Sequence, residues 1–488
     1  MRDLFPVLRV LGLLLVFFAL SMNVPLAASW WWEDGMWQVW PAAMAVTVVA
    51  GVVLWFCMRH HRQELQPRHG VILVTLVWVC LPLSAALPMM LIYSQMGQDL
   101  SFTYAYFEAV SGLTTAGSSV LTNVDALPVS LNIWRTFLQW IGGMGILILA
   151  VAILPLLGVG GSQMFRAEAA GPVKDTKLTP RITGTAKGLW GVYAVFSASC
   201  LLAYWLGGMT PMDALMHMFT TVSLGGTSSH ASSFAYFNSP LLEGIAFVFM
   251  VAASCNFALY FVAMRKGSWH GFWRDPEMQA TVGVLLLGGL FVALLLWVKD
   301  VYGLLDALRY GMFNTVSVAS TTGFVTADYV LWPVFAPIFM LILSGMATSA
   351  GSTGGGIKMM RMLILFSQAR RELTRLVHPR AVQPVVLGGR FVDNRMIFAV
   401  MAFMLVYGGT IVLLSMVLLL TDLDPVTAFS AVVASVHCVG PGLGIVGPAS
   451  TYAELTDFQI WVCTLGMLLG RLEILSFLAL LTPAFWRR

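Results

Sequence analysis

Charged residues are scarce in this sequence. Only 10% of its 488 residues are Asp, Glu, Lys or Arg, whereas 58% are hydrophobic and the mean hydropathy is +0.82. A soluble domain carries about 25% charged residues. The composition therefore excludes an ordinary soluble protein. It predicts a chain that crosses a membrane many times, with lipids as surroundings and no nucleic acid as partner.

Cysteine is scarce as well, and no two of the six cysteines form a CxxC pair. Most of them lie in apolar runs, where a free thiol behaves as a small hydrophobic side chain. Their spacing is typical of neither a disulfide framework nor a zinc site. We therefore expect buried free thiols at Cys57, Cys80, Cys200, Cys255, Cys438 and Cys463.

Long apolar runs, by contrast, are abundant. A spanning helix needs about 20 mostly apolar residues. The first run resembles a signal peptide, but it is longer than the roughly 7–15 apolar residues of such a peptide, which favours an uncleaved helix. We predict an all-α polytopic membrane protein with ten transmembrane helices, near residues 10–28, 37–58, 71–94, 133–157, 187–208, 240–264, 279–298, 333–362, 396–420 and 458–482.

The basic residues predict how these spans are oriented, because Lys and Arg gather in cytoplasmic loops. With the N-terminus inside, the inner loops hold all but four of the 27 Lys and Arg residues. Acidic residues gather in the opposite loops. Ten spans then leave both termini in the cytoplasm. The four exceptions are Arg135, Lys299, Arg309 and Arg471.

Four outer segments are too polar or too short to cross a membrane, yet too apolar for ordinary loops. Each reads as a short helix followed by a tail that contains glycine. They are FEAVSGLTTAGSSV (107–120), MDALMHMFTTVSLGGTSSH (212–230), LDALRYGMFNTVSVASTTGFVTADY (305–329) and DPVTAFSAVVASVHCVGPGLGIVG (424–447). An acid suits the positive end of a helix dipole, and we expect one at or just ahead of each helix start: Glu108, Asp213, Asp306 and Asp424.

This pattern is a degenerate fourfold repeat of span, re-entrant helix, tail and span, and such a repeat decides the fold. Four copies close a pore around a pseudo-fourfold axis, and the first two helices fall outside the repeat. The expected units are an N-terminal two-helix extension (1–69), repeat 1 (70–186), repeat 2 (187–277), repeat 3 with a broken inner helix (278–395) and repeat 4 (396–488).

The tails have the composition of a cation filter. Non-helical backbone at membrane depth must be buried in protein or line water, and rings of backbone carbonyls replace the hydration shell of an ion. Glycine permits the unusual dihedrals that this demands. We align the tails as Thr115-Ala116-Gly117, Leu224-Gly225-Gly226, Thr321-Thr322-Gly323 and Gly440-Pro441-Gly442.

Only the glycine is shared by all four tails, which favours one dominant ion site rather than many equal ones. The alternative reading is four apolar outer loops rich in Gly and Ser. The recurrence of the pattern between successive spans favours the filter.

A second glycine cluster interrupts the eighth span in the stretch SGMATSAGSTGGG. Glycine costs about 1 kcal/mol per residue in a helix, so the cluster predicts an unwound loop below the filter that obstructs the pathway and moves to open it. The alternative is close helix packing through a GxxxG motif. The gate residues in this prediction are Gly345, Gly351, Ser352, Thr353, Gly354, Gly355 and Gly356.

Two charged residues, Arg471 and Glu473, lie within the last span. A charge near the bilayer centre costs about 2.5–3.5 kcal/mol on insertion scales and usually faces water or a partner. Arg471 therefore either projects into the pore as a barrier to cations or forms a structural ion pair. His217 and His437 lie in re-entrant helices, and a structural role is favoured for both over a proton relay.

Several long motifs resemble the TrkH/TrkG-type bacterial potassium uptake subunits of the Trk/Ktr/HKT superfamily, and the resemblance covers essentially the whole chain. It is carried by LQWIGGMGILILAVAILPLLGVGG, FRAEAAGPVKDTKLTPRITGTAK, AGSTGGGIK, RELTRLVHP, GPGLG and GRLEILSFLALLTPAFWR.

The resemblance implies K⁺ uptake through the bacterial inner membrane and no enzymatic activity. It implies a homodimer with one pore per protomer, filter glycines at Gly117, Gly226, Gly323 and Gly442, a gating loop at 345–356 and a pore-facing Arg471. It also implies a cytosolic ring of regulatory subunits that bind NAD(H) or ATP, so that no nucleotide or other cofactor is expected on this chain. The basic loops 159–187 and 358–395 are candidate docking surfaces, although contact with anionic lipid explains them too.

Three other functions stay open. A proton- or sodium-coupled symporter with low K⁺/Na⁺ discrimination would share the filter. A polytopic membrane enzyme would need converging titratable residues, and only Arg471 and Glu473 lie clearly within spans. A structural or receptor-like bundle would leave the fourfold repeat without explanation.

Overall fold

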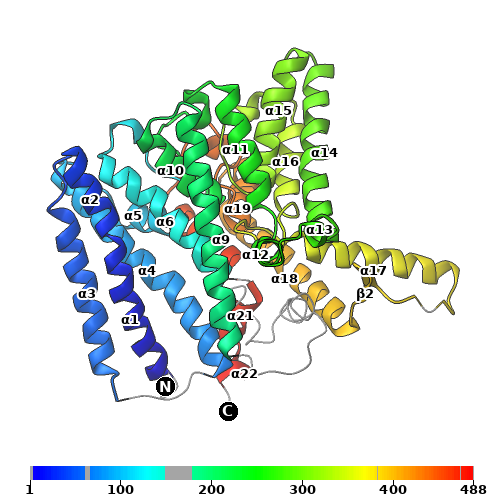
Figure 1. Cartoon of the computed structure of the whole chain (residues 1–488), viewed down its shortest axis with the longest axis horizontal. Coiled ribbons are helices and arrows are strands. Elements are labelled where there is room, and N and C mark those ends of the chain that lie inside the picture. Colours follow the sequence, from blue (N-terminus) through cyan, green and yellow to red (C-terminus); the bar gives the residue numbers. More distant parts are fainter. Residues whose placement is uncertain (1–3, 61–65, 149–178, 382, 473, 487–488) are drawn as a thin grey trace.

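The structure of the protein is a computed structural model. It describes residues 4–60, 66–148, 179–381, 383–472 and 474–486. Within these ranges the regular secondary structure is helical apart from one short hairpin, in which β1 (Val386–Leu387) pairs with β2 (Arg390–Phe391). The helices form a bundle whose two termini lie at the same end, and we call the opposite end the distal face (Figure 1). The predicted all-α membrane architecture is confirmed.

The first three helices are α1 (Phe5–Ser21), α2 (Asn23–Trp32) and α3 (Val39–Cys57). They stand together at one side of the bundle (Figure 1). Small residues let helix backbones approach closely in a membrane. A Cβ at Gly12 would lie 2.6 Å from the carbonyl oxygen of Gly51, so the two glycines allow α1 and α3 to pack closely.

Four units follow, and each contains a long helix, a short helix and a further apolar helix. Their helices are α4 (Pro67–Gln95), α5 (Phe102–Leu113) and α6 (Val129–Ile148); α9 (Thr179–Leu206), α10 (Pro211–Val222) and α11 (Pro240–Ala253); α14 (Pro276–Val298), α15 (Leu304–Ala319) and α16 (Phe335–Ser344); and α18 (Asn394–Leu419), α19 (Pro425–His437) and α20 (Asp457–Arg471).

Of the remaining elements, the α-helices connect these units or end the chain, and the 3₁₀ turns lie within the units, between the short helix and the third helix. They are α12 (Phe257–Lys266), α13 (His270–Trp273), α17 (Met359–Val377), α21 (Ile474–Leu481), α22 (Pro483–Trp486) and the 3₁₀ turns η2 (Val124–Ala126), η4 (Ser233–Tyr236), η5 (Tyr329–Leu331), η6 (Gly444–Val446) and η7 (Tyr452–Glu454).

The second helix of each unit is too short to cross a membrane. These helices, α5, α10, α15 and α19, have 12, 12, 16 and 13 residues. At 1.5 Å per residue they reach about 18–24 Å, less than the roughly 30 Å of a hydrocarbon core. The predicted short helices between spans are therefore confirmed, and we call these four the pore helices.

The expected acid at the helix start is present in three of the four pore helices. Asp213 and Asp306 lie in the first turns of α10 and α15, and Asp424 caps α19 by accepting the N–H groups of Val426 and Thr427. The prediction is wrong for Glu108, which lies well inside α5. The N-cap of α5 is Ser101, whose side chain accepts the N–H of Tyr104.

Six helices in the described ranges are long and apolar enough to cross a membrane, if α1 and α2 are taken together as one. They are Phe5–Trp32, Val39–Cys57, Arg68–Gln95, Ala186–Leu206, Pro276–Val298 and Asn394–Leu419. The other four predicted spans contain α6, α11, α16 and α20. The predicted span 133–157 extends past α6 into residues outside the described ranges.

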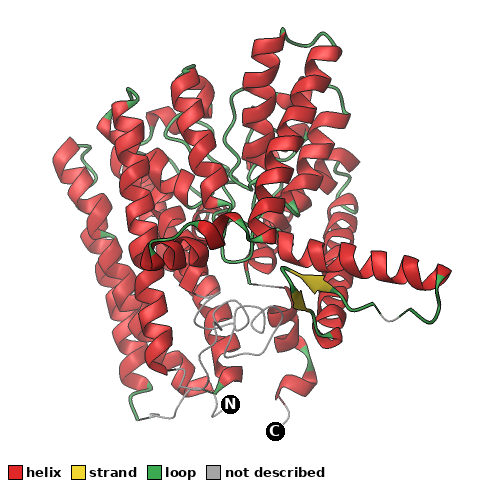
Figure 2. Ribbon diagram, turned by 45° about the vertical axis from the view of Figure 1, so that its right-hand side comes forward, coloured by secondary structure: helices red, strands yellow, loops and turns green. Residues whose placement is uncertain are grey.

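Two predicted spans do not run straight. The segment 240–264 is bent by 88° between α11 and α12, where Asn256 caps α12 by accepting the N–H of Ala258. The prediction of a continuous sixth span is therefore wrong. In the eighth span, α16 ends at Ser344, and α17 runs sideways from the bundle (Figures 1 and 2). The predicted break lies between them, but the segment does not resume as a span.

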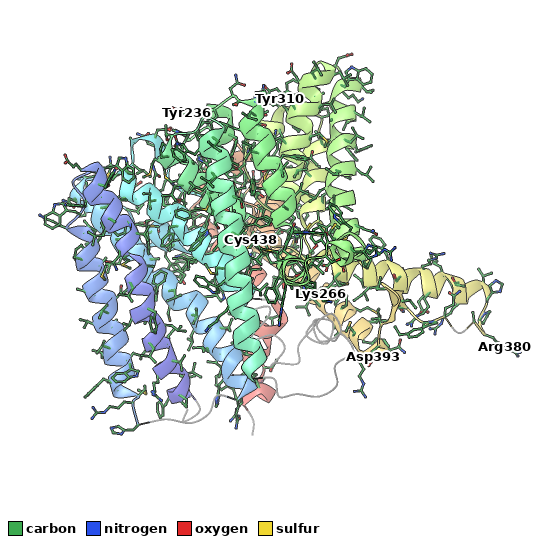
Figure 3. The ribbon with its side chains drawn as sticks, viewed as in Figure 1. Tyr236, Lys266, Tyr310, Arg380, Asp393 and Cys438 are labelled. Carbon is green, nitrogen blue, oxygen red and sulfur yellow. The ribbon has the colours of Figure 1, made fainter. Side chains whose placement is uncertain are left out.

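All six cysteines are free, as predicted, and four of them are buried. The prediction of burial is wrong for Cys57, which is exposed, and Cys80 is only partly covered. Cys438 lies at mid-depth in the bundle, whereas Tyr236 and Tyr310 lie at the distal face (Figure 3).

Candidate functional site

The four pore helices end in the same way. Each is followed by a residue with a left-handed backbone, which is uncommon for residues other than glycine. This residue comes directly after the C-cap in α5, α10 and α15, and it is the C-cap itself in α19. The next N–H then bonds the carbonyl five residues back, as in a Schellman motif. The left-handed residues are Thr115 (φ 55°), Leu224 (φ 55°), Thr321 (φ 62°) and Cys438 (φ 57°). The bonds are Ala116 N to Ser111 O (2.9 Å), Gly225 N to Thr220 O (2.8 Å), Thr322 N to Ser317 O (2.8 Å) and Val439 N to Ala434 O (2.9 Å).

A glycine with positive φ stands two residues after each left-handed residue. These glycines are Gly117 (φ 78°), Gly226 (φ 70°), Gly323 (φ 88°) and Gly440 (φ 98°). We call the segments Thr115–Gly117, Leu224–Gly226, Thr321–Gly323 and Cys438–Gly440 tails 1 to 4.

The alignment of the fourth tail from sequence, Gly440-Pro441-Gly442, is therefore wrong by two residues. Because α19 ends at His437, the tail begins at Cys438 and its third residue is Gly440. The N–H of Gly442 instead donates to the carbonyl oxygen of Val446 at 2.8 Å, within a turn that follows the tail. In the sequence alignment, Gly442 was matched to Gly117, Gly226 and Gly323, whereas Gly440 is their structural equivalent.

The four tails interlock in a closed cycle. A Cβ at Gly117 would overlap the carbonyl oxygen of Gly225, one at Gly226 would overlap that of Thr322, and one at Gly323 would overlap that of Val439. A Cβ at Gly440 would lie 3.1 Å from the carbonyl oxygen of Ala116, which closes the cycle. Each tail glycine thus makes room for the carbonyl of the neighbouring tail, and φ is positive at all four positions. Glycine meets both requirements, because it has no side chain and readily adopts positive φ.

A hollow of about 120 Å³ lies over this cycle, and all four tail glycines contribute to its lining. We call it the vestibule. Hydroxyl and backbone groups of Ser118, Thr227 and Tyr452 line it together with Arg135 and His230, and no carboxylate is among its lining residues in the described ranges.

A charged network at the vestibule joins repeats 1 and 2. The two ring nitrogens of His230 lie 3.1 Å from Asp125 Oδ1 and 3.2 Å from Asp213 Oδ1. Burial lowers the pKa of His230, but the hydrogen bonds to Asp213 and Asp125 outweigh it and raise the pKa above its ordinary value. Burial raises the pKa of Asp213, but hydrogen bonds from His230, Thr210 and Ser229 outweigh it and lower the pKa.

Side chains that the sequence analysis did not single out hold the tails. The hydroxyls of Tyr452 and Ser118 donate to the carbonyl oxygen of Gly440 at 2.9 and 3.1 Å. The amide of Gln139 donates to the carbonyl oxygen of Gly225 at 2.9 Å. No sequence signal marks these three residues, because their role depends on tertiary contacts, which for Ser118 and Gln139 join different repeats.

The glycine-rich segment 345–358 lies directly against the inner ends of three pore helices. The hydroxyl of Thr353 donates to Val222 O of α10 at 3.0 Å, and the N–H of Gly355 donates to Thr321 Oγ1 of tail 3 at 2.9 Å. A Cβ at Gly355 would overlap the carbonyl oxygen of His437 in α19. Gly354, Gly355 and Thr353 therefore form the part of the predicted gate that meets the tails.

The other predicted gate residues hold the segment against its surroundings. Gly351 O accepts the N–H of Phe257 at 3.1 Å, beside the bend between α11 and α12. Gly356 has a φ of 77°, and Gly345 packs close to the ring of His437. The hydroxyl of Ser352 donates to Ser349 O at 2.7 Å. The break between α11 and α12 thus contacts the break between α16 and α17.

Arg471 ends α20 and is 3% exposed. Its Nη1 donates to the carbonyl oxygen of Thr353 at 3.0 Å, whereas Nε and Nη2 find no hydrogen-bond partner among the described residues. The alternative prediction for Arg471, a structural ion pair, is not observed among the described residues. Glu473 lies outside the described residues.

The two histidines of the pore helices contact neighbouring protein groups. His217 lies within hydrogen-bond distance of Asp213 O (2.8 Å) and Ser228 Oγ (2.9 Å), and His437 Nδ1 lies 2.8 Å from Ser344 Oγ. These contacts fit the structural role favoured from the sequence. No group of three or more His, Cys, Asp or Glu side chains in the described ranges could hold a metal ion.

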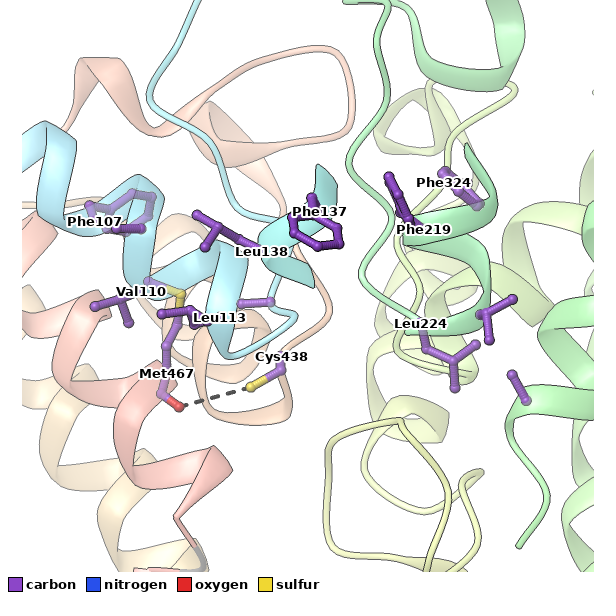
Figure 4. Packing of buried hydrophobic residues seen from close by; sticks show 14 of the residues in the cluster. Phe107, Val110, Leu113, Phe137, Leu138, Phe219, Leu224, Phe324, Cys438 and Met467 are labelled. Atoms are coloured by element: carbon purple, nitrogen blue, oxygen red, sulfur yellow. Dashed lines mark hydrogen bonds between the residues drawn. The ribbon is translucent and has the colours of Figure 1, made fainter. Parts of the chain in front are cut away.

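The ends of the pore helices are also packed by apolar side chains from several repeats. Leu113, Leu138 and Leu224 belong to one buried cluster around the tails (Figure 4). Cys438 belongs to it too, and its Sγ donates to the carbonyl oxygen of Met467 at 3.9 Å. The tails are therefore anchored in the hydrophobic core rather than in surface loops.

Four short helices that point interlocked tails at one hollow, within a polytopic bundle, define a membrane transport protein rather than an enzyme. The cation transport protein family described as TrkH matches residues 37–487. The chain belongs to this family of cation transporters.

Individual relatives match along nearly their whole length. The chain is 43% identical over 484 residues to the Trk system potassium uptake protein TrkH of Vibrio parahaemolyticus, covering 99% of both. It is 40% identical to the protein of that name from Escherichia coli K12 and 34% identical to the E. coli potassium uptake protein TrkG. The crystal structure of the V. parahaemolyticus potassium transporter TrkH superposes with a TM-score of 0.91 at 40% identity, covering 100% of this chain and 99% of that one.

Proposed function

We propose that the protein mediates K⁺ uptake across the bacterial inner membrane through the cycle of four tails. The observation that carries the proposal is the interlocking of the tails below one vestibule. Backbone carbonyls replace water around an alkali ion in such a setting. Relatives that are 34–43% identical are named potassium uptake proteins, which supports K⁺ as the ion.

In this proposal the ion pathway uses Thr115–Gly117, Leu224–Gly226, Thr321–Gly323 and Cys438–Gly440. The tails differ in sequence, and carbonyl oxygens in two of them already accept hydrogen bonds from side chains. These unequal oxygens favour one dominant ion site near the glycines. K⁺ is the transported ion, and this chain itself needs no other cofactor.

The predicted gating loop, 345–356, is the proposed gate. It contacts the ends of three pore helices, and it is held there by single hydrogen bonds from Thr353 and Gly355. Arg471 supports it by donating to Thr353 O, and a buried cation near the pathway also opposes the entry of other cations. Movement of this segment away from the tails would open the pathway.

The remaining elements of the proposal rest on the family. They are a homodimer with one pore per protomer and a cytosolic partner ring that binds NAD(H) or ATP. Cytoplasmic termini rest instead on the distribution of Lys and Arg, and repeat boundaries at 1–69, 70–186, 187–277, 278–395 and 396–488 rest on the repeated pattern in the sequence. The predicted docking loop 159–187 lies mostly outside the described residues. The second predicted loop, 358–395, contains α17 and the β-hairpin.

The experiment is cation flux into liposomes that contain the purified protein with its cytosolic partner, measured for K⁺, Rb⁺ and Na⁺. We expect K⁺ flux that exceeds Na⁺ flux. A proton-coupled symporter would show K⁺ flux that depends on a proton gradient, and a sodium-coupled one would need Na⁺. Absence of flux for every alkali cation would overturn the proposal.

The tail itself is tested with Gly323→Ala. At a φ of 88° and against the carbonyl of Val439, the new methyl group adds strain of about 1–3 kcal/mol, so we expect K⁺ flux to fall by about tenfold or more. Gly408→Ala in α18 is the matched control, because a Cβ there meets no atom within 4 Å. Equal flux from the two folded variants would contradict the assignment of tail 3.

A further inference from the structure

Gln139 is a buried amide in the middle of α6, and its exposed fraction is 0%. Its Nε2 donates to Gly225 O at 2.9 Å and to Thr227 Oγ1 at 2.5 Å. Its Oε1 accepts the N–H of Thr227 at 3.4 Å. One side chain from repeat 1 therefore brackets Gly226, the tail glycine of repeat 2, on both sides.

The stability of α6 alone does not explain this amide. An amide without partners costs several kcal/mol in an apolar environment, so a leucine would suit a spanning helix better. The side-chain hydrogen bonds of Gln139 all reach tail 2 or the residue after it, and none stays within α6. The amide is thus matched to the tail rather than to its own helix.

Tail 2 is shaped to receive the amide. A Cβ at Gly225 would overlap the Cδ and Oε1 atoms of Gln139. The equivalent residues of the other tails are Ala116, Thr322 and Val439, which all carry side chains. The missing Cβ at Gly225 therefore leaves space for the amide of Gln139, which explains why tail 2 alone among the tails contains two successive glycines.

The carbonyl of Gly225 also lies against Gly117 in the interlocked cycle. By fixing this carbonyl, Gln139 fixes the contact between tails 1 and 2. A smaller ion such as Na⁺ is well coordinated only if the surrounding oxygens move inward, and a tail held on both sides of its glycine resists that movement.

We propose that Gln139 is a positioning residue that sets the preference of the site for K⁺ over Na⁺ by holding tail 2 at a fixed distance from tail 1. This inference rests on the proposed cation filter. It adds a determinant of selectivity that lies outside the tails and comes from the neighbouring repeat.

The test uses Gln139→Met, which keeps the length of the side chain and removes both donors. The control is Gln459→Met, which removes another buried amide. Gln459 is 5% exposed and bonds Thr421 and Thr456, neither of which belongs to a tail. The K⁺/Na⁺ flux ratio is measured in liposomes for each variant after gel filtration has confirmed folding.

We expect Gln139→Met to lower the K⁺/Na⁺ flux ratio several-fold and Gln459→Met to leave it at the wild-type value. A purely structural role would lower both fluxes together and leave the ratio unchanged. If Gln139→Met does not fold, Gln139→Leu carries the same expectation, because it also removes the donor to Gly225 O and adds no charge beside the tails.

An unchanged ratio in a folded Gln139 variant, or an equal change in the control, would overturn the inference. In either case the proposed function is still supported if the wild-type protein transports K⁺ faster than Na⁺. A wild-type protein without alkali-cation flux would instead overturn the proposed function itself.

Discussion

At the scale of single residues, the backbone of the tails explains the sequence that encodes them. Glycine is the only residue shared by the four tails because each one faces the carbonyl of the next tail at positive φ. The residues before it vary, because their side chains meet different neighbours. Three of the four glycines could be identified from sequence alone. Gly440 could not, because three glycines (Gly440, Gly442 and Gly444) follow α19 closely and only the end of the helix shows which one belongs to the tail.

His230 gives a prediction at this scale. Its pKa is raised in the folded protein, so its contribution to stability is fully present below the unfolded value of about 6.5 and is lost as pH rises through the folded value. We expect the melting temperature of wild-type protein to fall as pH rises above about 6.5, and His230→Gln to lack this part of the pH dependence.

The measurement is thermal unfolding of both proteins in detergent across that pH range. His270→Gln, at an exposed histidine of α13, is the control and should follow the wild type. Parallel curves for wild type and His230→Gln would show that ionisation of His230 contributes nothing to the pH dependence of stability.

At the scale of elements, most of the architecture follows from the sequence. Apolar runs locate the spans, and short polar segments between them locate the pore helices. The bend at 254–256 was missed because AASCNF contains neither proline nor glycine, and the cap at Asn256 is indistinguishable in sequence from a polar residue within a span. The sideways course of α17 was missed because the apolar run MMRMLILF continues past the loop.

The contact between the gate segment and the tails can be tested with Thr321→Val. The change keeps the shape of the side chain and removes the acceptor for Gly355 N–H. Loss of a hydrogen bond of about 1 kcal/mol raises the open population about fivefold. We therefore expect K⁺ flux without the cytosolic partner to rise several-fold.

Thr115→Val separates loss of a tail hydroxyl from loss of the gate contact. Thr115 is the equivalent residue of tail 1, and its Oγ1 has no hydrogen-bond partner among the described residues. A rise in partner-independent flux should occur in Thr321→Val and be absent from Thr115→Val. Equal rises in both variants would show that the hydrogen bond to Gly355 does not hold the gate.

At the scale of the whole molecule, the four repeats form a single structural unit because their tails interlock. Each tail glycine depends on the backbone of the next repeat, and Gln139 and Ser118 of repeat 1 help to hold tails 2 and 4. The sequence predicts that the tails converge, but it does not show this interlocking, since backbone contacts between repeats leave no local pattern. The gate segment then joins three of the four pore helices at their inner ends.

The most direct test of this account is to locate the ion. A crystal structure of the protein with Rb⁺ or Tl⁺ in place of K⁺ would reveal the ion by its anomalous scattering. We predict the strongest peak within the cycle formed by Gly117, Gly226, Gly323 and Gly440. A fully occupied peak elsewhere in the protein, with none inside this cycle, would contradict the account.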